Sequence, residues 1–174
     1  MRHVVLVMAL LLLPSIALAD NSSQPRHRWV GIQFDVGVPD GAGFGLVFRP
    51  YVDWLRLHLV QTYNGLAGGV RGGFTFDPIN FPVAPTITLE GGHSFKGKLP
   101  GVDMPAIGYD YANLHLGLEF GKRNIWRFFV HGGITWAHVI TSDFQSFNGG
   151  PGSIGNPMLN LMGPSAKIGF TFYL

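Results

Sequence analysis

The feature that most constrains the fold of this chain is an alternation of apolar and polar residues, repeated in segments of about ten residues. The clearest segment, residues 113–120, reads Asn-Leu-His-Leu-Gly-Leu-Glu-Phe. Successive side chains of a strand point to opposite faces, so this order predicts a β-strand with one apolar and one polar face. Turn sequences such as Pro39-Asp40-Gly41 separate the segments. The chain is therefore predicted to be all-β.

Eight such segments follow one another between Arg28 and Leu174. We expect strands over about 28–38, 43–48, 52–62, 67–76, 86–90, 113–120, 126–136 and 165–174. Eight strands of alternating polarity are typical of the smallest common outer-membrane barrels. The pattern predicts an eight-stranded antiparallel up-and-down transmembrane β-barrel.

The first residues have the organisation of a secretory signal peptide. Arg2 and His3 precede an apolar run from Val4 to Leu18, and Ala17-Leu18-Ala19 is a small-x-small cleavage site. We expect residues 1–19 to be removed and residues 20–174 to form one domain. A retained membrane anchor is the alternative, but a run of about 15 apolar residues is short for a bilayer.

Composition excludes several kinds of site and favours one class of protein. The chain has no cysteine, so it has no site for a lipoprotein anchor, a disulfide or a cysteine-ligated metal. Without the signal peptide its net charge is +1, which gives no indication of nucleic-acid binding. Charged residues make up 13% where about 25% is usual. This low charge favours a protein whose outer surface faces lipid.

The polar faces of the expected strands carry too many charged and imidazole groups for a soluble core. The residues are Asp35, Arg56, His58, Arg71, Glu90, His115, Glu119, Arg127, His131 and Lys167. Buried charges persist when they are paired, so we expect Glu90 or Glu119 to pair with Arg71 or Arg127. An eight-stranded barrel is just wide enough for side chains, and these residues are predicted to fill it.

The two longest connections fall on one side of such a barrel. If the first strand starts in the periplasm, residues 96–110 and 139–163 form loops on the outer surface, where long loops are common. The second loop contains four exposed apolar residues: Phe144, Phe147, Ile154 and Leu159. These side chains are expected either to contact a surface partner or to pack on the barrel rim.

The spacing of two tryptophans can be compared with the height of the apolar band of a membrane barrel. Trp126 and Trp136 lie on one face of the same strand. At about 3.3 Å per residue and a tilt of about 40°, they stand about 25 Å apart along the membrane normal. We expect them in the two aromatic girdles of the barrel, and the alternative is a pair of tryptophans in a soluble core.

Catalytic and metal sites are not indicated. A lipid hydrolase needs a serine, a histidine and an acid, and the candidates are His93, Ser94 and Glu90. Neighbours on a strand point to opposite faces, so His93 and Ser94 cannot readily share a proton. His115 and Glu119 share a face but lie about 13 Å apart, too far to chelate one ion. We expect no enzymatic activity, no cofactor and no metal.

The final segment carries a more specific signal. Lys167, Gly169, Phe172 and Leu174 match the C-terminal pattern that the barrel-assembly machinery reads in bacterial outer-membrane proteins, with Leu174 in place of the usual phenylalanine. The chain resembles the small eight-stranded outer-membrane barrels of the OmpA-membrane-domain and OmpX type. The resemblance implies residence in the cell outer membrane, contact with its lipid, and contact with the assembly machinery during insertion.

The resemblance does not select a molecular function, because such barrels serve structural, adhesive and lipid-modifying roles. We expect a non-enzymatic protein with a filled polar interior, in a structural or surface-interaction role. One alternative is an enzyme that modifies lipid A or phospholipids. The other is a soluble periplasmic, lipocalin-like barrel for a small hydrophobic ligand, which predicts an apolar interior and a polar exterior.

Overall fold

The computed structural model describes residues 28–50, 52–97, 107–141 and 159–174. Within these ranges the chain forms eight strands: β1 (Val30–Val38), β2 (Gly41–Phe48), β3 (Leu55–Tyr63), β4 (Gly68–Phe76), β5 (Val83–Gly97), β6 (Ile107–Lys122), β7 (Trp126–Thr141) and β8 (Leu159–Tyr173). No helix in the described ranges is long and apolar enough to cross a membrane. The expected signal peptide lies outside them, as do Phe144, Phe147 and Ile154.

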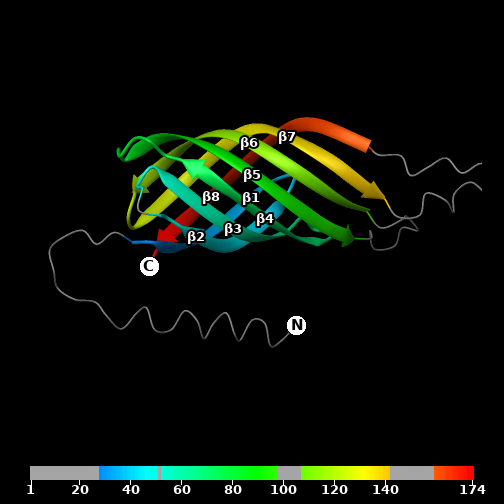
Figure 1. The fold of residues 1–174 in the computed structure, drawn as a ribbon, viewed down its shortest axis with the longest axis horizontal. Coiled ribbons are helices and arrows are strands. Elements are labelled where there is room, and N and C mark those ends of the chain that lie inside the picture. The colour runs from blue at the N-terminus through cyan, green and yellow to red at the C-terminus, as the bar shows by residue number, and fades with distance from the viewer. Residues whose placement is uncertain (1–27, 51, 98–106, 142–158) are drawn as a thin grey trace, which may run out of the picture.

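The strands close into one antiparallel barrel. Each strand pairs with its neighbours in sequence, and β8 returns to pair with β1. Figure 1 shows the strands running obliquely around a common axis. The predicted all-β, eight-stranded, antiparallel up-and-down barrel is confirmed as a fold.

The strand register fixes the dimensions of the barrel. A row of paired residues that starts on β6 circles the barrel and returns to β6 ten positions away: Phe120, Phe128, Phe170, Phe34, Phe44, Gln61, Val70, His93 and Asp110. With about 3.3 Å per residue and about 4.8 Å between strands, this shear gives a strand tilt of about 40° and a backbone radius of about 8 Å. Side chains can fill an interior of this size.

The two ends of the barrel differ. At one end, here called the turn end, residues 49–54, 77–82 and 123–125 connect the strands. At the other, here called the loop end, β5 to β8 run further than β1 to β4: they have 15 or 16 residues each, whereas β1 to β4 have 8 or 9. In Figure 1 the green to orange strands extend past the blue and cyan ones on the right. The long strands therefore form a one-sided wall at the loop end.

The predicted loops 96–110 and 139–163 are too long, because the strands extend into both ranges. Of the range 96–110, Lys96 and Gly97 belong to β5 and residues 107–110 to β6. Of the range 139–163, residues 139–141 belong to β7 and residues 159–163 to β8, so Leu159 is a strand residue. The alternation of polarity fades here because the outward positions become polar, yet cross-strand pairing continues. Pairing of the backbone, which polarity does not report, extends these strands.

A smaller correction concerns Trp54. The sequence predicts a third strand over about 52–62, which includes Trp54, but β3 begins at Leu55. Trp54 lies in the preceding turn, 46% exposed, with its ring 5.4 Å from that of Phe76. Its neighbours Arg56 and His58 do face inward, as expected.

Candidate functional site

The barrel interior gathers the charged residues of the chain. All ten polar residues expected there are buried, none more than 6% exposed. Buried charged side chains in the described ranges are six basic and five acidic: Arg49, Arg56, Arg71, Arg123, Arg127, Lys167, Asp35, Asp40, Asp77, Glu90 and Glu119. The sequence did not single out Arg49, Asp40, Asp77 and Arg123, because they lie in turns, where charges are usually solvated. The interior is close to electrically balanced.

The first cluster, nearer the loop end, is centred on Arg71 and Glu90. Arg71 donates a hydrogen bond to Asp35 at 2.7 Å and another to Asp40, and its Nε lies 3.3 Å from Glu90 Oε1. Lys167 donates to Glu90, and its Nζ lies 3.4 Å from Asp40 Oδ2. Two basic groups thus share three carboxylates.

Two histidines complete the surroundings of Glu90. His58 Nε2 lies 3.0 Å from Glu90 Oε1, and His115 Nδ1 lies 3.7 Å from Oε2. His115 is held on its other side by Ser165 Oγ, 2.8 Å from its Nε2. Glu90 therefore joins residues of β3, β4, β6 and β8 from its own position on β5.

The second cluster lies in the middle of the barrel. Both terminal nitrogens of Arg56 donate to the carboxylate of Glu119. His131 Nε2 lies 3.5 Å from Glu119 Oε1, and its ring stacks on Phe129 at 4.7 Å between centroids. Gly117 makes room for this ring, since a Cβ there would lie 2.0 Å from a ring carbon of His131.

The third cluster closes the turn end. Arg123 donates to Asp77 Oδ1 at 2.9 Å and to Oδ2 at 3.1 Å. Arg49 donates to the Arg123 carbonyl oxygen at 2.9 Å and to the Tyr173 hydroxyl at 2.9 Å. Its guanidinium carbon also lies 4.6 Å from the centre of the Tyr173 ring. Burial lowers the pKa of Arg49 below its ordinary value.

Three of the ion pairs cross the lumen, while others, such as Arg71 with Glu90, join neighbouring strands along its wall. Arg56 on β3 reaches Glu119 on β6, Arg71 on β4 reaches Asp35 on β1, and Lys167 on β8 reaches Glu90. In each pair the two strands are three positions apart around the barrel. The side chains act as braces that fix opposite walls, and they occupy the space that a channel would need.

The predicted pairs are formed only in part. Glu90 lies next to Arg71, as expected. Glu119, however, pairs with Arg56, and the side chain of Arg127 is directed to the turn end, with Nη2 3.8 Å from Asp77 Oδ2. Arg127 meets Glu119 only through the backbone carbonyl oxygen, at 3.5 Å. Which arginine pairs with Glu119 depends on how β3 and β6 lie opposite each other across the barrel. No local sequence pattern encodes this arrangement.

The residues considered for chemistry do not form a catalytic group. His93 faces outward and hydrogen-bonds Asp110 at 2.6 Å, while Ser94 is buried and receives a hydrogen bond from Asn64 at 3.2 Å. Glu90 belongs to the first cluster. In the described ranges no three His, Cys, Asp or Glu residues are arranged to hold a metal ion. His58 and His131 approach different carboxylates, Glu90 and Glu119.

The outward face is apolar over most of the length of the strands. Exposed charged side chains within the eight strands are Lys96, Asp110 and Lys122, and each lies close to a strand end. Trp126 pairs in register with Lys122, and Trp136 pairs with Ala112, two residues from Asp110. Both tryptophans face outward, 38% and 43% exposed. They border a band of the surface that carries no charge in the described strands.

The residues of the terminal pattern divide between the two faces. Lys167 is buried in the first cluster, and Phe172 and Leu174 point outward, 43% and 50% exposed. Gly169 faces inward, where a Cβ would lie 2.6 Å from the Phe129 ring and 2.3 Å from the Phe34 carbonyl oxygen. A glycine is therefore required at this position by packing alone.

Comparisons with models of protein families, with characterised proteins and with solved structures each found no match to this chain.

Proposed function

We propose that this protein is an integral outer-membrane β-barrel with a filled interior, in a structural or surface-interaction role at its loop end. The proposal rests on the polarity of the two barrel faces: eleven buried charges inside and a charge-free apolar band outside. A soluble barrel has the opposite order, because exposed apolar surface costs about 25 cal/mol per Å² in water. Lipid is the surroundings that match this exterior.

The height of the band supports a membrane. Asp110 and Lys122, the charged residues on the outward face of β6, are twelve positions apart. At about 3.3 Å per residue and a tilt of about 40°, they stand about 30 Å apart along the barrel axis. The hydrocarbon core of a bilayer is about 30 Å thick, and the apolar band of outer-membrane barrels is about 25 Å tall. Trp126 and Trp136 would then lie at the two interfaces.

Because the interior is filled with side chains, we propose that the protein acts through its surface. The ion pairs that cross the lumen leave the barrel braced, which suits a rigid platform better than a pore. The one-sided wall of β5 to β8 carries the connections that lie outside the described ranges. We propose the loop end as the region that meets a surface partner, since loops on rigid scaffolds commonly carry recognition.

Gel mobility of the isolated outer-membrane fraction tests the location. Folded outer-membrane barrels resist detergent until they are heated, so we expect the unboiled sample to migrate differently from the boiled one. Recovery of the protein in the soluble periplasm, with no shift on boiling, would refute the proposal and favour a ligand-binding soluble barrel. Altered lipid A or phospholipid in a deletion strain would instead assign an enzymatic role.

A matched pair of substitutions on β6 sharpens this test. Leu116 lies in the middle of the band, 66% exposed, and Ala112 lies at its edge in register with Trp136. Arginine in a membrane barrel costs about 2–4 kcal/mol at the midplane and about 0–1 near an interface. Leu116→Arg should therefore reduce the heat-shifting form far more than Ala112→Arg. Equal amounts of folded protein would indicate that water surrounds the barrel.

A further inference from the structure

A groove lies on the outward face of the long-stranded wall. It has a volume of about 420 Å³ and is lined by three consecutive residues from each of β6, β7 and β8: Asp110, Tyr111, Ala112, Trp136, Ala137, His138, Asn160, Leu161 and Met162. The register pairs Asp110 with His138 and His138 with Asn160, so these three lie in one row. The volume is within the range of about 300–1,000 Å³ typical of small-ligand sites.

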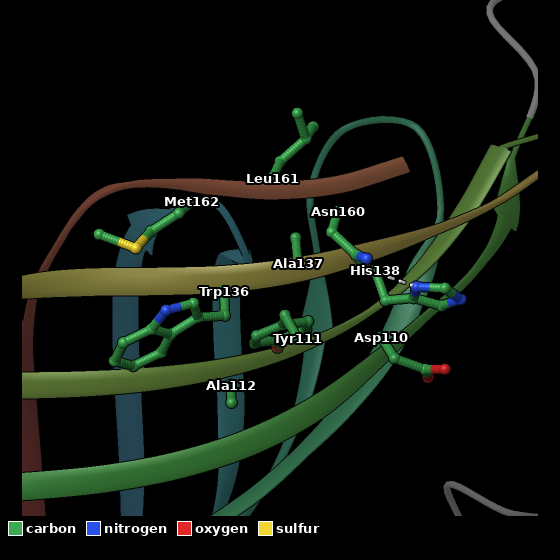
Figure 2. A pocket seen from close by; sticks show the side chains of 9 residues that line it. All are labelled: Asp110, Tyr111, Ala112, Trp136, Ala137, His138, Asn160, Leu161 and Met162. Atoms are coloured by element: carbon green, nitrogen blue, oxygen red, sulfur yellow. Dashed lines mark hydrogen bonds between the residues drawn. The ribbon is translucent and has the colours of Figure 1, made fainter. Parts of the chain in front are cut away.

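The groove has one apolar and one polar end. In Figure 2 Trp136 and Met162 lie toward one end, and Asp110, His138 and Asn160 lie toward the other. Along the strand the polar row is two residues, about 7 Å, beyond the row of Trp136. The apolar end therefore opens toward the charge-free band, and the polar end faces away from it. A lipid lying along the wall matches this division, with its chain on Trp136 and its headgroup on the polar row.

The hydrogen-bonding groups of the polar row specify the headgroup. Asp110 uses Oδ1 to accept from His93 at 2.6 Å, and Asn160 uses Oδ1 to accept from His138 at 2.8 Å. Asp110 Oδ2 and Asn160 Nδ2 have no partner among the described residues, so the row offers one acceptor and one donor. They lie on either side of His138, on strands about 10 Å apart. A hydroxyl group donates and accepts at once, and two hydroxyls at opposite edges of one sugar ring can reach the two groups.

Other headgroups fit less well. The described lining contains no Lys or Arg, so an anionic phosphate would meet the negative charge of Asp110 without compensation. An ammonium group would use Asp110 alone and leave the Asn160 amide unmatched. A sugar ring uses both groups, and its C–H face can lie on the flat apolar surface of Trp136.

We propose that this groove binds one glycolipid, with a sugar headgroup on Asp110 and Asn160 and an acyl chain against Trp136 and Met162. The proposal rests on the membrane location given above. It extends that function by naming the lipid class that the loop-end wall selects.

Fluorescence quenching in vesicles tests the proposal. A variant with Trp29→Phe, Trp54→Phe and Trp126→Phe reports from Trp136 alone, and is reconstituted in phosphatidylcholine vesicles. Equal mole fractions of lipids with brominated chains are then added, carrying glucosyl, phosphocholine, phosphoethanolamine or phosphoglycerol headgroups. We expect the glucosyl lipid to compete for the Trp136 site about fivefold better than the phosphocholine lipid, the factor that one additional hydrogen bond supplies.

Substitutions in the polar row provide the matched controls. Asp110→Asn replaces the free acceptor and Asn160→Leu removes the free donor, so each should lower the fivefold preference, and the double variant should bring it close to one. Gln61→Leu removes an outward amide from β3, on another side of the barrel, and should leave the preference unchanged. A preference that survives Asp110→Asn and Asn160→Leu would place the sugar contact elsewhere and refute the assignment.

The remaining outcomes separate this inference from the proposed function. Equal quenching by all four lipids, or a preference for the ethanolamine or glycerol headgroup, would overturn the glycolipid site while leaving the membrane location intact. No quenching of Trp136 by any brominated lipid, together with none in the counterpart that retains only Trp126, would remove the membrane location itself.

Discussion

The inward and outward faces of the same eight strands are organised by different interactions. Inward side chains are charged, buried and paired across the lumen, as in the Arg71 cluster. Outward side chains are apolar and remain exposed, as with Leu116 at 66% and Val70 at 45%. The comparison teaches that specific pairing braces this barrel from inside, while its exterior presents apolar side chains without such pairs. The inward face should therefore be sensitive to single substitutions and the outward face tolerant.

The largest difference is expected between neighbours on β4. Arg71→Met leaves Asp35, Asp40 and Glu90 with Lys167 as their remaining close cation. Breaking a buried pair from one side costs about 3–5 kcal/mol. Val70→Met, on the outward face, should change the free energy of unfolding by less than about 0.5 kcal/mol. Urea unfolding in vesicles, followed by tryptophan fluorescence, measures both, and similar losses would contradict the division between the faces.

A second prediction compares the net contribution of an ion pair to the free energy of unfolding with the loss caused by removing one partner alone. Arg56→Met and Glu119→Leu should each destabilise the barrel by about 3 kcal/mol, because each removes the oppositely charged partner of a buried group. The double variant removes both charges and should be more stable than either single variant. A double-mutant cycle from the same unfolding measurement gives the coupling, and simple additivity would show that the two side chains do not act as a brace.

A third prediction concerns two adjacent glycines of β7. Gly133 faces inward, where a Cβ would lie 1.9 Å from the Leu114 carbonyl oxygen, whereas Gly132 faces outward with nothing within 4 Å. Gly133→Ala should cost about 1–3 kcal/mol through overpacking. Gly132→Ala should leave the stability unchanged or raise it by about 0.4–1 kcal/mol, since alanine restricts the unfolded chain. The reverse order of stability would exclude this packing of the interior.

The smallest effect is expected at the exposed pair of the loop end. The side chains of His93 and Asp110 are 42% and 55% exposed and lie 2.6 Å apart. Exposed pairs contribute about 0–1 kcal/mol, so His93→Gln should reduce the free energy of unfolding by no more than that. A loss comparable to that of Arg71→Met would mean that this pair is enclosed in the folded protein.

The sequence predicts the faces better than the partners. Alternation is a local property, so the inward direction of His115 and Glu119 follows from their own neighbours in the chain. The pairing of Glu119 with Arg56 depends instead on the shear of the closed barrel, to which all eight strands contribute. Asp40 and Asp77 were missed because turn residues carry no alternation. Both are buried where they pair with an arginine, Asp40 with Arg71 and Asp77 with Arg123.

The strand ends show the same limit. Polarity changes at His93, Asp110, His138 and Asn160, and the sequence therefore suggests a loop where the structure continues β5 to β8. The outward surface is polar there because it lies beyond the apolar band, while the backbone ladder is indifferent to polarity. The groove proposed to bind a glycolipid lies on this part of β6, β7 and β8, between the edge of the apolar band and the ends of the strands.

The most direct test of the central claim measures what surrounds each face of β6. The chain has no cysteine, so single cysteines at positions 112 to 120 can carry a nitroxide label without background, and collisions with oxygen and with a water-soluble nickel complex can be measured in vesicles. We predict that oxygen collisions rise at Leu114, Leu116 and Leu118, with the greatest depth near Leu116. Frequent nickel collisions at Leu116 would contradict a lipid-facing exterior and the function proposed from it.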